Sequence, residues 1–233
     1  IQAQASSGAI GRLDYLGWGD RVRTALTSYG LYLALFVWPI PLTVFYPYHY
    51  ADFGWTGALI SAGATALLVL VCWRYRRQNP AALIGMLWFL GTLVPVIGLV
   101  QVGQQALADR YMYIPGIGLT WAVGWLLPGG VGPLDRRGVA SAFFAGAALV
   151  ALSCVTVWQL GFWQTSKQLF QRSLEVTNGN HVAHYLLAGE LRTEGRDDEA
   201  AYHFLETARI DQTGRHGANA LCKLGNLHNK YGR

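Results

Sequence analysis

The chain has 233 residues, of which 52% are hydrophobic and only 13% are charged. An ordinary soluble domain carries about 25% charged residues, so the deficit indicates a membrane protein and argues against a single soluble domain. The net charge of +5 does not indicate nucleic-acid binding, because no basic cluster is interleaved with aromatic residues. Half of the Lys and Arg residues lie from Lys167 onward. The residues before Lys167 are therefore more apolar than those that follow.

Residues 1–20 lack a signal-peptide pattern and are predicted to be a cytoplasmic or interfacial connector. Residues 21–163 are predicted to form a transmembrane region, because a helix needs about 20 apolar residues to cross the hydrocarbon core. About five spans are expected, at 24–44, 54–73, 81–100, 111–127 and 139–160. The segment 111–127 is short and contains Pro115, which leaves a re-entrant loop as the alternative there. Pro39 and Pro41 should end or kink the first span.

The arginines near the span ends predict an orientation. Five alternating spans place seven arginines on one side: Arg21, Arg23, Arg74, Arg76, Arg77, Arg136 and Arg137. The opposite short loops contain only Arg110, so the positive-inside rule makes the seven-arginine side cytoplasmic. Everything after Trp163 is then expected outside the cytoplasm. The aromatic residues expected at the outer headgroups are Trp38, Tyr46, Tyr48, Tyr50 and Trp55.

After Trp163 the pattern changes to amphipathic helices separated by polar turns. Gly195 and Gly232 close two matching helix-turn patterns, and with extra residues in the linker 212–217 their spacing fits the tetratricopeptide repeat. Residues 167–176 resemble the second helix of a preceding degenerate unit. The expected fold class is therefore all-α, with a polytopic transmembrane helical bundle followed at 164–233 by a tetratricopeptide α-solenoid. Such arrays bind a protein or peptide on their concave face. Both chain ends look like cuts in a longer protein.

The loop between the third and fourth predicted spans carries amides and an acid–base pair. Such groups are costly at membrane depth unless they are paired or line a wet cavity, so a binding pocket is predicted. Arg110 is suited to phosphate oxygens, Asp109 could orient a neighbour, and Tyr111 and Tyr113 could stack on a sugar. An interfacial anchor of snorkelling side chains is the alternative. The candidate residues are Arg110, Asp109, Tyr111, Tyr113, Gln101 and Gln105.

The loop 45–53 is expected on the same side and adds the secondary candidates Tyr46, His49 and Asp52. No metal site is predicted, because the histidines of the repeats share no evident ligand geometry: His181, His184, His203, His216 and His228. The three cysteines match neither a disulfide framework nor a metal site. Cys72, Cys154 and Cys222 are interpreted as small buried hydrophobic residues.

The segments Pro95–Gly103, Ala108–Leu119 and Phe45–Pro47 resemble the membrane part of bacterial glycosyltransferases that contain tetratricopeptide repeats. These enzymes are similar to the eukaryotic TMTC family of protein O-mannosyltransferases. The resemblance implies a GT-C fold in the inner (plasma) membrane, with the repeats periplasmic, or lumenal in a eukaryote. It also implies a polyprenyl- or dolichyl-phosphate-linked sugar as donor and a protein acceptor recruited by the repeats.

The resemblance assigns no catalytic residue in this chain. The catalytic acid of the family lies in an outer loop between its first two spans, which this sequence does not contain. Arg110, Asp109 and Tyr111 are carried over as donor-site candidates, with Arg110 expected to stabilise the departing lipid phosphate.

Two alternatives remain open from the sequence. One is a non-catalytic membrane scaffold whose repeats bind a partner. The other is a polymerase or ligase of lipid-linked polysaccharide, which would share the lipid carrier but use a glycan acceptor.

Overall fold

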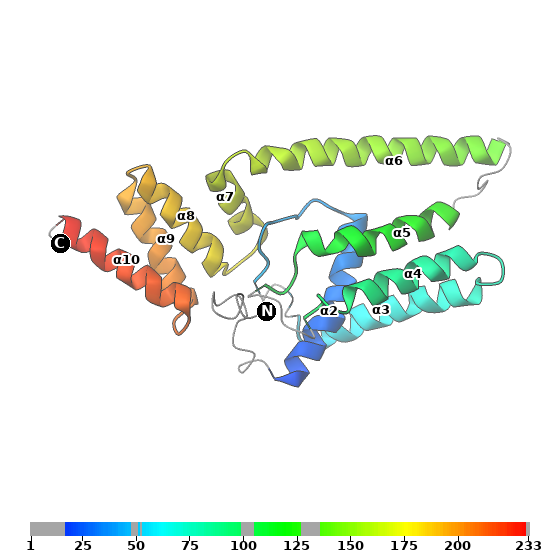
Figure 1. Cartoon of the computed structure of the whole chain (residues 1–233), viewed down its shortest axis with the longest axis horizontal. Coiled ribbons are helices and arrows are strands. Elements are labelled where there is room, and N and C mark those ends of the chain that lie inside the picture. The colour runs from blue at the N-terminus through cyan, green and yellow to red at the C-terminus, as the bar shows by residue number, and fades with distance from the viewer. Residues whose placement is uncertain (1–16, 48–50, 52, 99–104, 127–135, 232–233) are drawn as a thin grey trace. The chain divides into compact units, whose positions relative to one another are not determined.

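The structure is a computed structural model that describes residues 17–47, 51, 53–98, 105–126 and 136–231. The elements in this part of the chain are helices (Figure 1). Contacts divide the chain into two units. The first comprises residues 1–41 and 48–157, and the second comprises residues 42–47 and 158–233. Each unit is described by itself.

The described residues of the first unit form four α-helices, a short 3₁₀ helix and most of a fifth α-helix. They are α2 (Trp18–Val37), α3 (Gly54–Arg74), α4 (Pro80–Leu93), η3 (Asp109–Met112), α5 (Tyr113–Leu126) and α6 (Arg136–Leu160). Two helical segments of the described chain, Gly54–Arg74 and Gly138–Trp163, are long and apolar enough to cross a membrane. Only 11% of the first and 0% of the second is buried in their most apolar windows, so the described chain leaves most of their apolar surface uncovered.

Helices α4 and α5 form a tightly packed antiparallel pair. The Asn79 amide before α4 donates to the Trp125 carbonyl near the end of α5 at 2.6 Å. The Trp88 indole farther along α4 donates to the Ile114 carbonyl at the start of α5 at 3.0 Å. Between these points Gly85 and Gly118 meet, and a Cβ atom on either would overlap the carbonyl oxygen of the other. Small residues permit such close backbone approach, which is common between helices in membranes.

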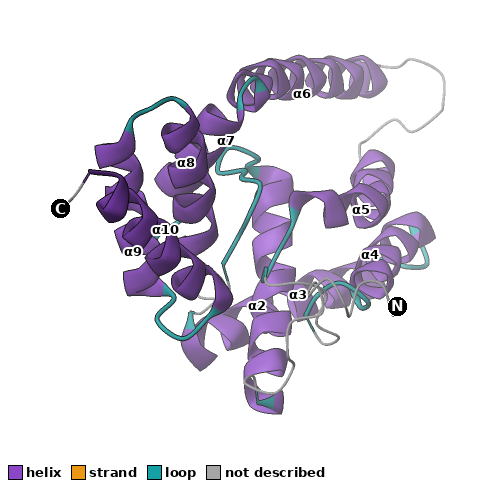
Figure 2. Cartoon of the chain, turned by 60° about the vertical axis from the view of Figure 1, so that its left-hand side comes forward, coloured by secondary structure: helices purple, strands orange, loops and turns teal. Residues whose placement is uncertain are grey.

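Helix α2 runs across its neighbours (Figures 1 and 2). A Cβ atom added at Gly19 would lie 3.9 Å from the Trp55 ring in the first turn of α3. The Tyr29 hydroxyl donates to the Leu90 carbonyl near the end of α4 at 3.0 Å. The Tyr32 hydroxyl bonds the backbone just before η3. Helix α2 therefore contacts the start of α3, the end of α4 and the start of η3, which form one end of the α3–α5 layer.

This position of α2 differs from the predicted first span, 24–44. A first span followed by an outer loop would place the beginnings of α2 and α3 on opposite faces, whereas Gly19 lies beside Trp55. The helix also ends at Val37, because Pro39 and Pro41 lack the N–H groups that would continue it. At its other end, residues 18–20 of the predicted connector belong to α2, while 1–16 lie outside the described residues.

The other predicted spans agree with the observed helices to different degrees. The predictions 54–73 and 139–160 lie close to α3 and α6. The prediction 81–100 is too long, because α4 ends at Leu93 and a turn containing Pro95 follows. The prediction 111–127 corresponds to the end of η3 and to α5, which has 14 residues.

The second unit consists mainly of four helices after the end of α6. A 3₁₀ turn, η4 (Gly161–Trp163), leads into α7 (Ser166–Val176), α8 (His181–Thr193), α9 (Asp197–Ile210) and α10 (Arg215–Tyr231). Consecutive helices pack against one another (Figure 2). Thr165 and Asn180 cap α7 and α8 by accepting backbone N–H groups, and Gly195 makes the turn into α9 with a φ of 78°. The core residues are Leu187, Ala188, Leu191, Ala200, Phe204, Ala220 and Leu227.

The segment Leu42–Pro47, far away in the sequence, is built into this second unit. The Gln159 amide donates to the Leu42 carbonyl at 3.2 Å, and the Thr43 hydroxyl donates to the Ser173 hydroxyl at 2.7 Å. The Asn180 amide donates to the Phe45 carbonyl at 3.1 Å. The contact boundary therefore falls near Trp158, before the predicted boundary at 163/164, and the second unit includes a loop that the sequence assigns to the membrane region.

Two smaller expectations need correction. The turn between α9 and α10 is shorter than the predicted linker 212–217, because α10 begins at Arg215. The cysteines are free but are not buried by the chain: Cys72 is half-buried, and Cys154 and Cys222 are exposed. An apolar sequence around a residue shows that the helix is hydrophobic, but it does not show which face of the helix packs against the rest of the chain.

Candidate functional site

The candidate site lies where a buried segment turns into the exposed start of α5. Ala106, Leu107 and Ala108 are almost fully buried. The 3₁₀ helix η3 follows directly, and the Tyr111 N–H donates to the Ala108 carbonyl at 2.9 Å. The chain therefore leaves the interior at Ala108 and presents Asp109 and Arg110 at the surface of the first unit.

A hydroxyl from α2 fixes this turn. The Tyr32 hydroxyl accepts from the Ala108 N–H at 3.1 Å and donates to the Ala108 carbonyl at 3.2 Å. Tyr32 is only 1% exposed, so both bonds are shielded from water. The sequence does not single out Tyr32. The sequence feature that could have identified Tyr32 is a phenol in the middle of an apolar helix, because a buried hydroxyl needs a hydrogen-bond partner.

Three predicted site residues come together beside this turn. The Gln105 amide donates to the Tyr111 hydroxyl at 3.1 Å. The guanidinium carbon of Arg110 lies 5.3 Å from the centre of the Tyr111 ring, and the Arg110 side chain is exposed. Stacking orients a guanidinium and leaves its N–H edge open to planar oxygen groups such as a phosphate. Asp109 is half-buried next to them. The arrangement can bind an anion and, through Tyr111 and Gln105, hydroxyl groups.

The remaining candidates are placed differently. Tyr113 begins α5 and is 80% exposed. Tyr46 is fully buried and its hydroxyl accepts from the Thr43 N–H, so its ring is not open to stack on a sugar. Gln101, His49 and Asp52 lie outside the described residues.

Four histidines of the second unit lie in pairs, although the sequence showed no shared geometry among them. The Nδ1 atoms of His184 and His203 lie 2.8 Å apart, a hydrogen bond in which one ring donates and the other accepts. The rings of His181 and His216 lie 5.6 Å apart. Burial lowers the pKa of His184, His203 and His216. The sequence could not pair them, because each pair joins two different helices.

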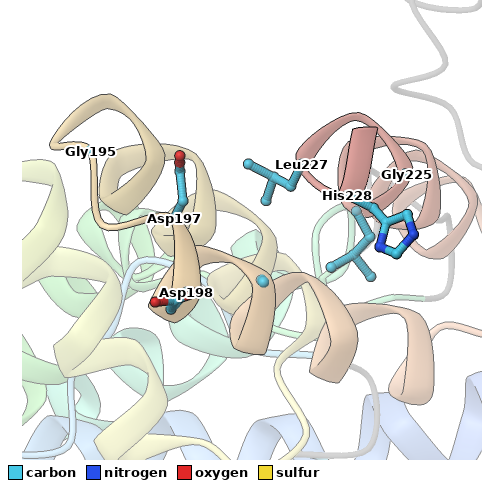
Figure 3. A pocket seen from close by; sticks show the side chains of 8 residues that line it. Gly195, Asp197, Asp198, Gly225, Leu227 and His228 are labelled. Atoms are coloured by element: carbon cyan, nitrogen blue, oxygen red, sulfur yellow. The ribbon is translucent and has the colours of Figure 1, made fainter. Parts of the chain in front are cut away.

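A hollow lies between α9 and α10 in the second unit (Figure 3). It has a volume of about 590 Å³. Asp197 and Asp198 from the first turn of α9 line one wall, and Leu227 and His228 of α10 line the other. The Lys230 ammonium pairs with Asp197 at 2.7 Å. A mixed acidic and apolar lining suits a peptide side chain better than a phosphate.

Comparisons with known proteins point to one group of enzymes. The chain is 27% identical over 220 residues to a mouse protein named protein O-mannosyl-transferase TMTC1, and 27% identical over 222 residues to the human protein of that name. The alignments cover 88% and 86% of this chain, but only 23% and 24% of the relatives, so the chain spans about a quarter of their length. No family model matches the sequence, and no solved structure matches it. The similarity supports a distant relationship to these protein O-mannosyl-transferases.

Proposed function

We propose that this chain is part of a membrane glycosyltransferase that moves a sugar from a polyprenyl-phosphate-linked donor to an acceptor outside the cytoplasm. The observation that carries the proposal is the similarity to the two TMTC1 proteins along nearly the whole chain. The names of these relatives describe protein O-mannosyl transfer, so a protein hydroxyl is the proposed acceptor. The catalytic carboxylate that removes the acceptor proton belongs to a part of the enzyme not contained in this sequence.

In this proposal the Asp109–Tyr111 turn binds the donor. Arg110 holds the phosphate of the lipid carrier and stabilises the charge that develops as the sugar departs. Its stacking on Tyr111 and the bond from Gln105 to Tyr111 pre-orient the group. Because Tyr32 fixes the backbone at Ala108, α2 acts as the support of the donor site.

The proposed membrane arrangement has α3, α4, α5 and α6 as crossing segments, with α2 lying over the outer ends of the first three. It replaces the five-span prediction. The arginines after α3 and at the start of α6 remain on the cytoplasmic side: Arg74, Arg76, Arg77, Arg136 and Arg137. Arg110 and the second unit then lie outside the cytoplasm, with the donor site at the outer headgroup level.

The second unit is proposed to be part of a tetratricopeptide array. Its helices α8 and α10 begin at His181 and Arg215, which matches the 34-residue period of that repeat. The hollow between α9 and α10 offers carboxylates and apolar side chains to a peptide. The array is therefore proposed to recruit the protein acceptor.

The decisive experiment measures sugar transfer by the full-length enzyme in membranes. Arg110→Ala should lower the transfer rate about 100-fold, because a group that stabilises the transition state is lost. Arg110→Lys should recover part of the activity, since the charge returns without the planar fork. Arg209→Ala is the matched control, because Arg209 is also exposed but lies on α9.

Unchanged transfer by Arg110→Ala would remove Arg110 from the donor site. A wild-type enzyme that transfers no sugar but captures a partner protein would favour the membrane scaffold. A polysaccharide product without modified protein would favour the polymerase or ligase.

A further inference from the structure

A second cavity lies at the junction of α6 and α7, entirely within the second unit. It has a volume of about 380 Å³, which lies within the range of small-ligand pockets. One wall is aromatic and comes from Trp158 and Phe162, whose ring centres are 5.0 Å apart. The opposite wall is polar and comes from α7. An aromatic wall facing a polar one is an arrangement that can bind a ligand with one apolar face and several hydroxyl groups.

The polar wall follows the helical period of α7. Gln168, Gln171, Arg172 and Glu175 recur at intervals of three and four residues, which places them on one face of the helix. Both glutamines are exposed, and among the described residues neither side-chain amide makes a hydrogen bond. Each amide therefore has a donor and an acceptor to offer a ligand.

Arg172 joins the two walls. Its guanidinium carbon lies 5.2 Å from the centre of the Trp158 ring and 4.8 Å from that of Phe162. It also forms an ion pair with Glu175 at 3.2 Å. The guanidinium is thus fixed in place, and its charge is balanced by a carboxylate that is 63% exposed. The side chains that line the cavity therefore carry no net charge.

This chemistry selects among possible ligands. An anionic headgroup would meet Glu175 as well as Arg172, and an acyl chain would bury the two amides without partners. A neutral pyranose ring satisfies both walls, because its C–H face packs on the exposed part of Trp158 and its hydroxyls pair with the amides and with Glu175. Trp158 is 47% exposed, which leaves ring surface for this contact.

We infer that this cavity is a carbohydrate-binding site for a neutral pyranose, separate from the donor site at Arg110. It does not depend on the proposed transferase activity, because binding can be measured without transfer. In the glycosyltransferase it would hold a glycan near the start of the repeats while the acceptor is recruited.

Ligand-detected NMR can test this inference on the whole protein in phosphatidylcholine nanodiscs. Nanodiscs are required because sugar-based detergents would compete for the site. The probes are the methyl glycosides of mannose, glucose and galactose. Saturation transfer is expected to at least one of them. The double variant Gln168→Ala/Gln171→Ala should bind it about tenfold more weakly, because two hydrogen bonds are lost. Trp158→Leu should also weaken binding, whereas Gln212→Ala, at an exposed glutamine outside the cavity, should not.

Three outcomes would overturn the inference. The first is an absence of saturation transfer from every methyl glycoside at millimolar concentration. The second is glycoside binding that the double variant leaves unchanged. The third is binding of short-chain phosphatidylglycerol that depends on Arg172 while the glycosides do not bind, which would make the cavity an anionic-lipid site. Competition by a glycolipid added to the nanodisc supports the inference and identifies a lipid-linked sugar as the source.

Discussion

A single hydroxyl determines how the chain enters the candidate donor site. Replacing Tyr32 by Phe would leave the buried Ala108 N–H without its partner, at a cost of about 1–3 kcal/mol. The Ala108 carbonyl keeps the Tyr111 N–H, so the turn should loosen without disappearing. We expect Tyr32→Phe to lower sugar transfer by the full-length enzyme while membrane insertion is retained.

Tyr29→Phe is the matched control for this change. It removes another hydroxyl that α2 donates to a backbone carbonyl, but that carbonyl belongs to Leu90. Transfer activity should therefore fall less than in Tyr32→Phe. Equal losses in the two variants would mean that α2 supports the helices generally and has no particular role at Ala108.

The histidine pair of α8 and α9 makes the second unit sensitive to acid. Burial lowers the pKa of both His184 and His203, with Glu199 and Glu206 acting in the opposite direction on His203. Once the pH falls below about 6.5, the unfolded chain therefore binds more protons than the folded chain. The free energy of unfolding then decreases as the pH decreases. The stabilisation is complete above that pH and is lost as the pH drops toward the lowered pKa values.

Hydrogen-exchange protection of α8 and α9, corrected for intrinsic rates, should thus decrease between about pH 7 and pH 5. His203→Gln should flatten this dependence, because the pair is removed. His228→Gln should leave it unchanged, since His228 is exposed and lies on α10. An equally steep pH dependence in His203→Gln would assign the effect to other groups.

At the scale of elements, the contact between α4 and α5 depends on two glycines. A side chain at Gly118 would overlap the Gly85 carbonyl and approach Trp88, so Gly118→Leu should force the helices apart. Overpacking of this kind costs about 1–3 kcal/mol or more. We expect a lower yield of monodisperse protein and a lower Tm. Gly91→Leu on α4 is the control, because nothing lies within 4 Å of a Cβ atom there. Equal stability of the two variants would contradict the close packing.

The same scale shows what the sequence could and could not predict. The helices α3 and α6 were predictable because long uncharged runs have few alternatives. Helix α2 was predicted as a span because residues 24–44 are equally uncharged, but composition does not record that Tyr29 and Tyr32 bond groups at the ends of other helices. Likewise, Arg110, Tyr111 and Gln105 could be proposed from local sequence. Tyr32 could not, because it lies 76 residues from Ala108.

At the scale of the whole molecule, the two membrane arrangements differ in the position of the start of α2. Five alternating spans put Gly17 on the same side as Gln78, whereas an α2 that lies over the outer ends puts Gly17 with the second unit. Single cysteines at Gly17, Gln78 and Gln212 can separate these arrangements, because all three positions are exposed. Each single-cysteine variant must be made in a protein that lacks the native cysteines, Cys72, Cys154 and Cys222.

We expect a membrane-impermeant maleimide applied from outside to label Gly17→Cys and Gln212→Cys in intact cells or in sealed vesicles of the same orientation. Gln78→Cys should react only after permeabilisation, because the arginines beside it stay on the cytoplasmic side. Labelling of Gly17→Cys only after permeabilisation would restore α2 as a crossing helix. It would also remove the physical basis for Tyr32 as a support at the outer surface. Outside labelling of Gln78→Cys would reverse the whole orientation and would place Arg110 on the side opposite to an extracytoplasmic acceptor.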